Sequence, residues 1–219
     1  MISQAILAIT LLSAAPALAG PELAYGPEIK FAAFRNGEHI GSHRLTFEKE
    51  GDRLVVTTSI DLAVKVIGIT AYRYTHRSRE TWFGEELHSF DSQTDDNGKP
   101  YTVRARRNPL DLEVERKAPG TAALQQVIMP ADLLPSTHWN ARQTAQGFLL
   151  NAQKGTKEEI AVTSLGRESV KTMSGFVPAM HYRYEGGVQM EQWFDDWGRW
   201  IKSRFVVSDG STIEYLLQE

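Results

Sequence analysis

Apolar and polar side chains alternate along most of the chain with a period of two, which is the repeat of a β-strand with one buried face. The clearest example is Arg53–Ile67, where aliphatic residues occupy the even positions and only Thr58 interrupts them. No long segment shows the 3.6-residue repeat of an amphipathic helix. The pattern therefore predicts an all-β domain.

Short turn sequences separate the predicted strands. Asn36-Gly37 and Asp209-Gly210 are examples, because both residue types tolerate the positive φ angles of tight hairpin turns. About a dozen strands joined in this way form an antiparallel meander. We predict strands at Ile29–Arg35, Ile40–Lys49, Arg53–Ile67, Ile69–Phe83, Leu87–Thr94, Tyr101–Arg107, Leu112–Arg116, Phe148–Asn151, Glu159–Leu165, Met180–Tyr184, Val188–Phe194, Trp200–Val207 and Thr212–Leu217.

The middle of the chain differs from the rest. Ala118–Gln126 is rich in small and polar residues and is predicted to be a loop. Met129–Asn140 contains two prolines and is predicted to be irregular, with one short helical turn at most. A sheet of this many twisted strands does not stay flat. We expect a single domain over residues 20–219: one large curved antiparallel sheet that forms an open or closed barrel, with Met129–Asn140 across its mouth.

Two stretches resemble each other in sequence. Tyr72–Tyr74 precedes Glu80–Phe83, and the similar Tyr182–Tyr184 precedes Glu191–Phe194. An internal duplication would make the domain two related halves. The alternative is coincidence between aromatic-rich strands.

The N-terminus has the features of a signal peptide. The first 19 residues lack Asp, Glu, Lys and Arg, and the apolar run Ala5–Leu12 precedes a small-x-small cleavage motif at Ala17–Ala19. An uncleaved anchor is the alternative, but a spanning helix needs ~20 apolar residues. We therefore predict that residues 1–19 are removed after Ala19 and that the mature chain is exported from Gly20 onward.

Composition narrows the classes of partner. The formal net charge of −3 is too small to favour a nucleic-acid partner. The chain has no cysteine, so it forms no disulfide and lacks the cysteine that lipid attachment after the signal would need. No later stretch reaches the length of a transmembrane helix. A soluble exported protein is the expectation.

Candidate catalytic and metal-binding residues are few. The chain has neither a G-x-S-x-G motif nor a Cys nucleophile, and Ser136 and His138 with Asp132 upstream are better explained as a turn than as a triad. His39 and His43 are four residues apart, but His39 falls in a predicted turn and no zinc motif is present. We predict no catalytic residue, no metal site and no cofactor.

The predicted inner face of the sheet is the best candidate for ligand binding. Leu62, Tyr72, Tyr74 and Trp82 occupy the apolar parity of two neighbouring strands. They either fill a solid core or line a pocket. We expect Leu62, near the middle of the sheet, to be core and Trp82, near its mouth, to line the pocket.

The opposite parity carries a candidate basic patch. Arg73, Arg77 and Arg79 share one face of a strand. Such a patch could contact phospholipid head groups or a carboxylate. The alternative is a solvated outer face that Asp and Glu neutralise.

Several of these segments together resemble a known family. They are the opening Phe34–Gly41, the later Tyr72 and Glu80–Trp82, and the closing Trp193–Asp195 and Ile213–Leu216. The sequence resembles an uncharacterised family of secreted bacterial proteins, domain of unknown function family 6134. It is also similar to a wider set of periplasmic β proteins, domain of unknown function family 3108. The resemblance implies a Gram-negative periplasmic location and a curved open-barrel sheet, and it transfers no functional residue.

Three functions remain open at this point. The leading hypothesis is a non-catalytic periplasmic protein that binds or carries an apolar or amphiphilic ligand, such as a lipid, inside the sheet. The second is an envelope-maintenance or assembly factor that binds another protein through a sheet edge or Met129–Asn140. The third is a lipid-modifying or isomerising enzyme.

Overall fold

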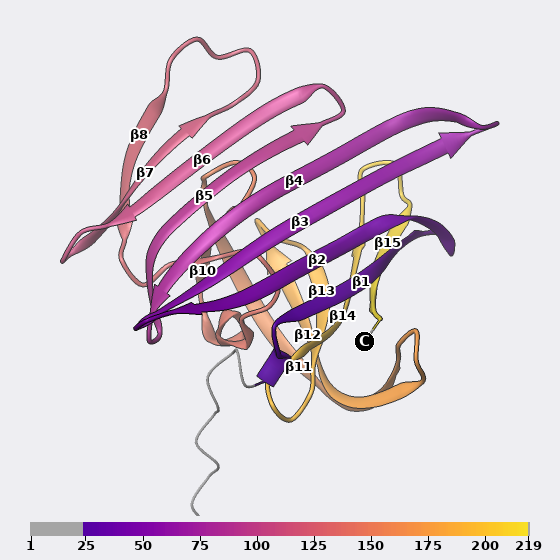
Figure 1. The fold of residues 1–219 in the computed structure, drawn as a ribbon. Helices are drawn as coiled ribbons and strands as arrows, with labels where there is room; N and C mark the ends of the chain where they lie inside the picture. The colour runs from indigo at the N-terminus through magenta and orange to yellow at the C-terminus, as the bar shows by residue number, and fades with distance from the viewer. Residues whose placement is uncertain (1–23, 219) are drawn as a thin grey trace, which may run out of the picture.

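The computed structural model describes residues 24–218, and one curved sheet accounts for most of them (Figure 1). Its 15 strands follow the order β8-β7-β6-β5-β4-β3-β2-β1-β15-β14-β13-β12-β11-β10-β9. Every neighbouring pair is antiparallel except β9 and β10. The all-β prediction is confirmed. The predicted signal peptide, residues 1–19, lies outside the described residues.

The elements have the following bounds. The strands are β1 (Glu28–Arg35), β2 (Glu38–Glu50), β3 (Arg53–Val66), β4 (Ile69–Phe83), β5 (Glu86–Asp96), β6 (Lys99–Arg107), β7 (Asp111–Lys117), β8 (Gln125–Pro130), β9 (Leu134–Pro135), β10 (Phe148–Leu150), β11 (Lys157–Lys171), β12 (Phe176–Gly186), β13 (Met190–Phe194), β14 (Trp200–Val206) and β15 (Thr212–Leu217). A 3-10 helix, η1, covers Ala141–Ala145. Within residues 24–218 no helix is long and apolar enough to cross a membrane.

The first and last strands meet in the middle of the sheet, where β1 pairs with β15. From there one meander runs outward through β2 to β8, and the other runs through β14 to β9. The sheet curls until the two meanders face each other across a shared core, as β2–β4 in front of β12–β14 show in Figure 1. Hydrogen bonds do not join its edges, so the predicted curved sheet is an open barrel.

The middle of the chain is more ordered than the sequence predicts. Gln125–Pro130 is strand β8, paired with β7, although it spans the end of the predicted loop and the start of the predicted irregular segment. Pro130 permits this because it is the last residue of β8, which is an edge strand. The short helix η1 begins after Asn140, whose side chain accepts a hydrogen bond from the Arg142 amide.

The two similar stretches occupy different structural positions. Tyr72–Tyr74 and Glu80–Phe83 lie on the single strand β4, whereas Tyr182–Tyr184 and Glu191–Phe194 lie on the two strands of the β12–β13 hairpin. The sequence match is therefore not a repeat of one structural unit.

Residues 131–156 run across the concave side of the sheet and fill one end of it. The Trp139 ring lies edge-on to Trp82, with centroids 5.5 Å apart, and edge-on to Phe47 at 5.7 Å. Farther along, the Ser92 hydroxyl donates to the Ala152 carbonyl at 2.6 Å. We call residues 131–156 the crossing segment.

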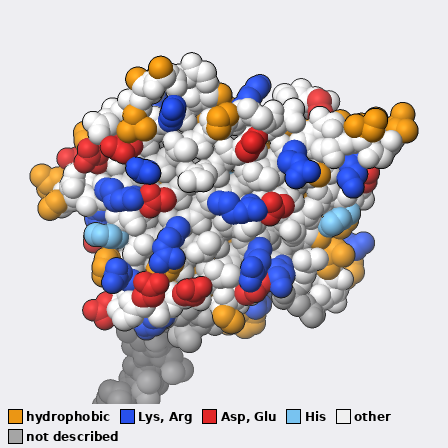
Figure 2. All heavy atoms as spheres, turned by 45° about the horizontal axis from the view of Figure 1, so that its top comes forward, with side chains coloured by type: hydrophobic (Ala, Val, Ile, Leu, Met, Phe, Trp, Pro, Cys, Tyr) orange, Lys and Arg blue, Asp and Glu red, His pale blue; other side chains and the backbone are white. Residues whose placement is uncertain are grey.

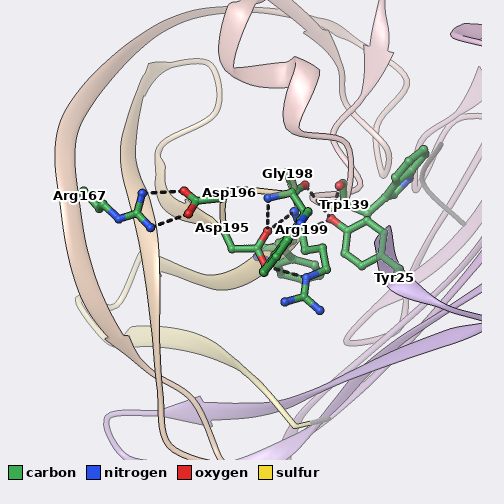
Figure 3. A network of polar contacts seen from close by, with 9 residues as sticks. Tyr25, Trp139, Arg167, Asp195, Asp196, Gly198 and Arg199 are labelled. Atoms are coloured by element: carbon green, nitrogen blue, oxygen red, sulfur yellow. Dashed lines mark hydrogen bonds and ion pairs between the residues drawn. The ribbon is translucent and has the colours of Figure 1, made fainter. Parts of the chain in front are cut away.

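A polar network fixes the crossing segment to the β13–β14 turn (Figure 3). The partly buried Tyr25 hydroxyl donates to the Trp139 carbonyl at 2.5 Å and accepts from the Trp200 amide at 2.6 Å. Asp195 shapes the β13–β14 turn by accepting from the Arg199 amide at 2.9 Å and from Arg199 Nε at 2.6 Å. The part of the crossing segment around Trp139 is thus held at the same end of the sheet as this turn.

Candidate functional site

The concave side encloses a cavity of about 920 Å³. Its mouth lies at the end of the sheet where alternate hairpin turns of the two meanders gather, because exposed and partly buried residues next to those turns line it. They include Arg35, Val66, Lys99, Gly187 and Asp209. A volume of this size is typical of small-molecule sites, which span about 300–1,000 Å³.

The outer part of the cavity is mainly apolar. Its walls come from alternate residues of strands in both meanders: Ile40, Ile60, Leu62, Val64, Met190, Phe205 and Ile213. The hydroxyl groups of Tyr72 and Tyr74 are engaged, since Tyr72 donates to Asp96 at 2.7 Å and Tyr74 donates to Gln153 at 3.2 Å. These tyrosines therefore present mainly ring surface to the cavity.

Deeper in the cavity the lining changes from apolar to polar. On β3, Thr58 lies inward of the aliphatic residues, and on β15 Tyr215 lies inward of Ile213. Cross-strand pairing sets His43 and His76 on either side of Ile60. We call the polar residues that line this inner end the polar layer: His43, Thr58, His76, His138 and Tyr215.

His43 and His76 are buried and uncharged at neutral pH. His43 is fully buried among rings, with its centroid 5.0 Å from Trp200 and 5.1 Å from Tyr215. His76 Nδ1 lies 2.7 Å from the Thr94 hydroxyl oxygen. Burial lowers the pKa of His76 to about 4 and the pKa of His43 well below its usual value of 6.5.

His138 enters the polar layer from the crossing segment. Its φ angle of 72° lies in the left-handed region, which non-glycine residues rarely adopt. Gln192 Nε2 donates to His138 Nδ1 at 2.9 Å, and the His138 ring stacks on Trp200 with centroids 5.0 Å apart. Burial lowers the pKa of His138 to about 4. The neutral ring therefore carries its proton on Nε2.

Part of the polar layer has unused hydrogen-bonding capacity. Among the described residues, neither ring nitrogen of His43 nor the hydroxyl of Thr58 has a hydrogen-bond partner, although both side chains are buried. Buried polar groups in native proteins are nearly always paired. Both residues lie in the cavity wall, but these atoms have almost no accessible surface, so a molecule in the cavity supplies the partners only once a side chain moves toward it.

A buried carboxyl group closes the inner end. Glu80 accepts from the indole Nε1 of Trp82 at 2.9 Å and from Trp139 Nε1 at 3.2 Å. Burial raises the pKa of Glu80 to about 7, although these hydrogen bonds and one with Thr137 oppose the rise. Trp82 and Trp139 border a second pocket of about 600 Å³ on the far side. Glu80, Trp82 and Trp139 therefore separate the large cavity from this second pocket.

The residues predicted to line a pocket fall into two groups, one at the large cavity and one at its inner end. Leu62, Tyr72 and Tyr74 border the large cavity. Leu62 is only partly buried, because it lines the cavity as well as packing against the hydrophobic core. Trp82 is 1% exposed at the inner end, not near the mouth. The reason is that consecutive turns of a meander lie at opposite ends of the sheet, and the β3–β4 turn, not the β4–β5 turn, lies at the mouth.

The candidate basic patch lies on the outer, charged face of the sheet. Arg77 forms a bidentate pair with Asp61 at 2.7 and 2.9 Å, and Arg79 lies 3.2 Å from Glu50. Arg73 is exposed near the β3–β4 turn. Figure 2 shows acidic and basic side chains interspersed over one face of the molecule. Such exposed pairs contribute little to stability, about 0–1 kcal/mol each.

The described residues considered for catalysis and metal binding form neither a hydrogen-bonded triad nor a metal site. The Ser136 hydroxyl accepts from the Ala152 amide at 3.1 Å, while His138 pairs with Gln192 and Asp132 is exposed. Within residues 24–218, no cluster of three His, Asp or Glu side chains is arranged to hold a metal ion. Imidazole hydrogen bonding is therefore the main chemistry that the polar layer offers.

The sequence did not identify the histidines as a group. His76 and Glu80 do break the apolar parity of the strand that contains Tyr72, Tyr74 and Trp82. That departure from alternation was the available signal. His138 gave no such signal, because it lies in Met129–Asn140, which was predicted to be irregular and has no strand period.

Comparisons with known proteins give a family but no activity. A family model described as "Domain of unknown function (DUF6134)" matches residues 31–218. No curated protein matches the chain, and no solved structure matches it.

Proposed function

The chain belongs to the domain-of-unknown-function family DUF6134, and we propose that it binds one amphiphilic small molecule, such as a lipid, in the cavity and carries it unchanged. The proposal extends to the compartment. The signal-like N-terminus supports export to the periplasm, where a carrier of this kind would serve the cell envelope.

The observation that supports the proposal is the change in lining along the length of the cavity. Aliphatic side chains such as Leu62 and Val64 form the outer part, and the polar layer forms the inner end. An amphiphile has the same division into a chain and a polar group. A chain placed against the outer walls loses contact with water, which contributes about 25 cal/mol for each Å² of apolar surface buried.

The chemistry of the inner end favours binding over catalysis. General acid–base catalysis works best when the pKa of the catalytic group lies near the working pH. Burial instead holds the pKa of His76 and of His138 at about 4. The carboxyl group of Glu80, with a pKa of about 7, is occupied by two indole donors and does not line the cavity.

A blocking variant tests the proposal. Leu62→Trp places a larger ring in the cavity, while Leu165→Trp adds the same ring at a position that is 41% exposed on β11. We expect the wild-type protein to bind a fluorescent alkyl probe in a one-to-one complex, whose stoichiometry native mass spectrometry can measure. Leu165→Trp should bind equally well, and Leu62→Trp should bind at least tenfold more weakly. If Leu62→Trp binds as tightly as the wild type, the ligand does not occupy the cavity.

Export is tested separately. N-terminal sequencing of the protein from a periplasmic fraction should give Gly20 as the first residue. An intact Met1 on a membrane-bound species would contradict the proposed compartment.

A further inference from the structure

We propose that the polar layer binds an uncharged hydrogen-bonding group, such as a hydroxyl, so that the preferred ligand is a neutral amphiphile oriented with its polar group inward. This inference rests on the proposed function and names the class of ligand. It is carried by the unpaired polar atoms at the inner end of the cavity and by the positions of the charged residues around it.

Two buried side chains at the inner end have unpaired polar atoms. His43 is fully buried, and neither of its ring nitrogens is hydrogen-bonded to another described residue. One nitrogen of a neutral imidazole donates and the other accepts. Thr58, 1% exposed and likewise unpaired, offers a hydroxyl that does both. A ligand hydroxyl, which is also both donor and acceptor, matches this set.

The charged side chains among the described lining residues are Arg35, Asp96, Lys99 and Asp209. Asp96 and Lys99 flank the β5–β6 turn, and Arg35 and Asp209 form an ion pair at 2.6 Å beside neighbouring turns of the mouth. A carboxylate or ammonium group at the inner end would thus be buried without an opposite charge, which is costly.

The histidines do not provide that charge. His43, His76 and His138 lie in mutual reach, with the His43 and His138 centroids 5.8 Å apart. Burial disfavours the charged form of each ring, and their mutual repulsion adds to that effect. The side chains that line the inner end therefore stay neutral. Glu80 lies behind them, does not line the cavity and accepts from the indoles of Trp82 and Trp139. An anion would have to remain near Arg35 and Lys99 at the mouth.

Three decyl amphiphiles of equal chain length test the inference. We would measure binding of 1-decanol, decanoate and decyltrimethylammonium to the mature protein at pH 7.5 by calorimetry. We expect 1-decanol to bind at least tenfold more tightly than either ion. If decanoate binds as tightly as 1-decanol or more tightly, the inference fails while amphiphile binding stands. If none of the three binds, the proposed function itself fails.

Variants locate the polar group. Thr58→Val and His43→Phe each remove unpaired polar atoms and retain shape, so both should fold. Each should weaken 1-decanol binding about fivefold, the effect of one neutral hydrogen bond. The matched control is Ser78→Ala, since Ser78 is equally buried and unpaired but does not line the cavity. If His43→Phe fails to fold, Thr58→Val decides. Affinity within twofold of the wild type in the folded variants would overturn the inference.

Discussion

The buried carboxyl group of Glu80 should give the protein an unusual dependence of stability on pH. Burial raises its pKa from 4.5 to about 7 in the folded state. Between these two values the folded state holds a proton that the unfolded chain releases. The contribution of Glu80 is therefore complete below pH 4.5 and is lost as the pH rises through 7.

The magnitude follows from the size of the shift. Each pKa unit corresponds to about 1.4 kcal/mol, so the change from 4.5 to about 7 amounts to about 3 kcal/mol. About 2–3 kcal/mol of it falls between pH 5 and pH 8. Glu80→Gln cannot ionise, and its amide oxygen can still accept from Trp82 or Trp139. Relative to this variant, the wild type should lose about 2–3 kcal/mol of unfolding free energy over that range.

Urea unfolding followed by tryptophan fluorescence at pH 5, 6, 7 and 8 measures this difference. Taking the difference cancels the contribution of the histidines, which both proteins share. The control is Glu191→Gln: arginine partners lower the pKa of Glu191 despite partial burial, so its contribution changes only below pH 5. A difference between wild type and Glu80→Gln that stays constant from pH 5 to pH 8 would refute the reasoning.

Three further predictions concern stability. In the Glu80→Gln background, the unfolding free energy should decrease as the pH falls from 6.5 to 4. The pKa of His76 is about 4 in the folded state, so the unfolded chain binds a proton that the folded chain does not. Urea titrations at both pH values measure this decrease. Trp82→Ala should cost about 3–5 kcal/mol by urea unfolding, whereas Leu62→Ala, at a partly open lining position, should cost less than about 2 kcal/mol. Ile67, 97% exposed with φ of 53°, is strained, so Ile67→Asn should leave the melting temperature unchanged or higher in calorimetry.

The strands were predictable because their evidence is local. Alternation over Arg53–Ile67 and the Asn36-Gly37 turn fix strand and hairpin without knowledge of the rest of the chain. Strand β8 was missed because Gln125–Pro130 has no clear alternation and is defined by its pairing with β7. Edge strands of this kind depend on a neighbour that the sequence does not reveal.

The site was less predictable because it forms between distant segments. Leu62, Tyr72 and Tyr74 could be assigned to one inner face, but the depth of each along the cavity depends on which turns gather at the mouth. His43 and His138 are far apart in sequence and meet only because the crossing segment lies on the concave side. The hydrogen bond from Trp139 to Glu80 has the same origin.

The most direct test of the central claim observes the histidine rings while a ligand binds. In protein with isotope-labelled histidine, 1-decanol should shift the ring signals of His43, His76 and His138, saturating at one molecule per chain. The exposed rings of His39 and His88 should not change. Unchanged signals from the three cavity histidines at saturating 1-decanol would contradict the account, as would shifts confined to His39 and His88.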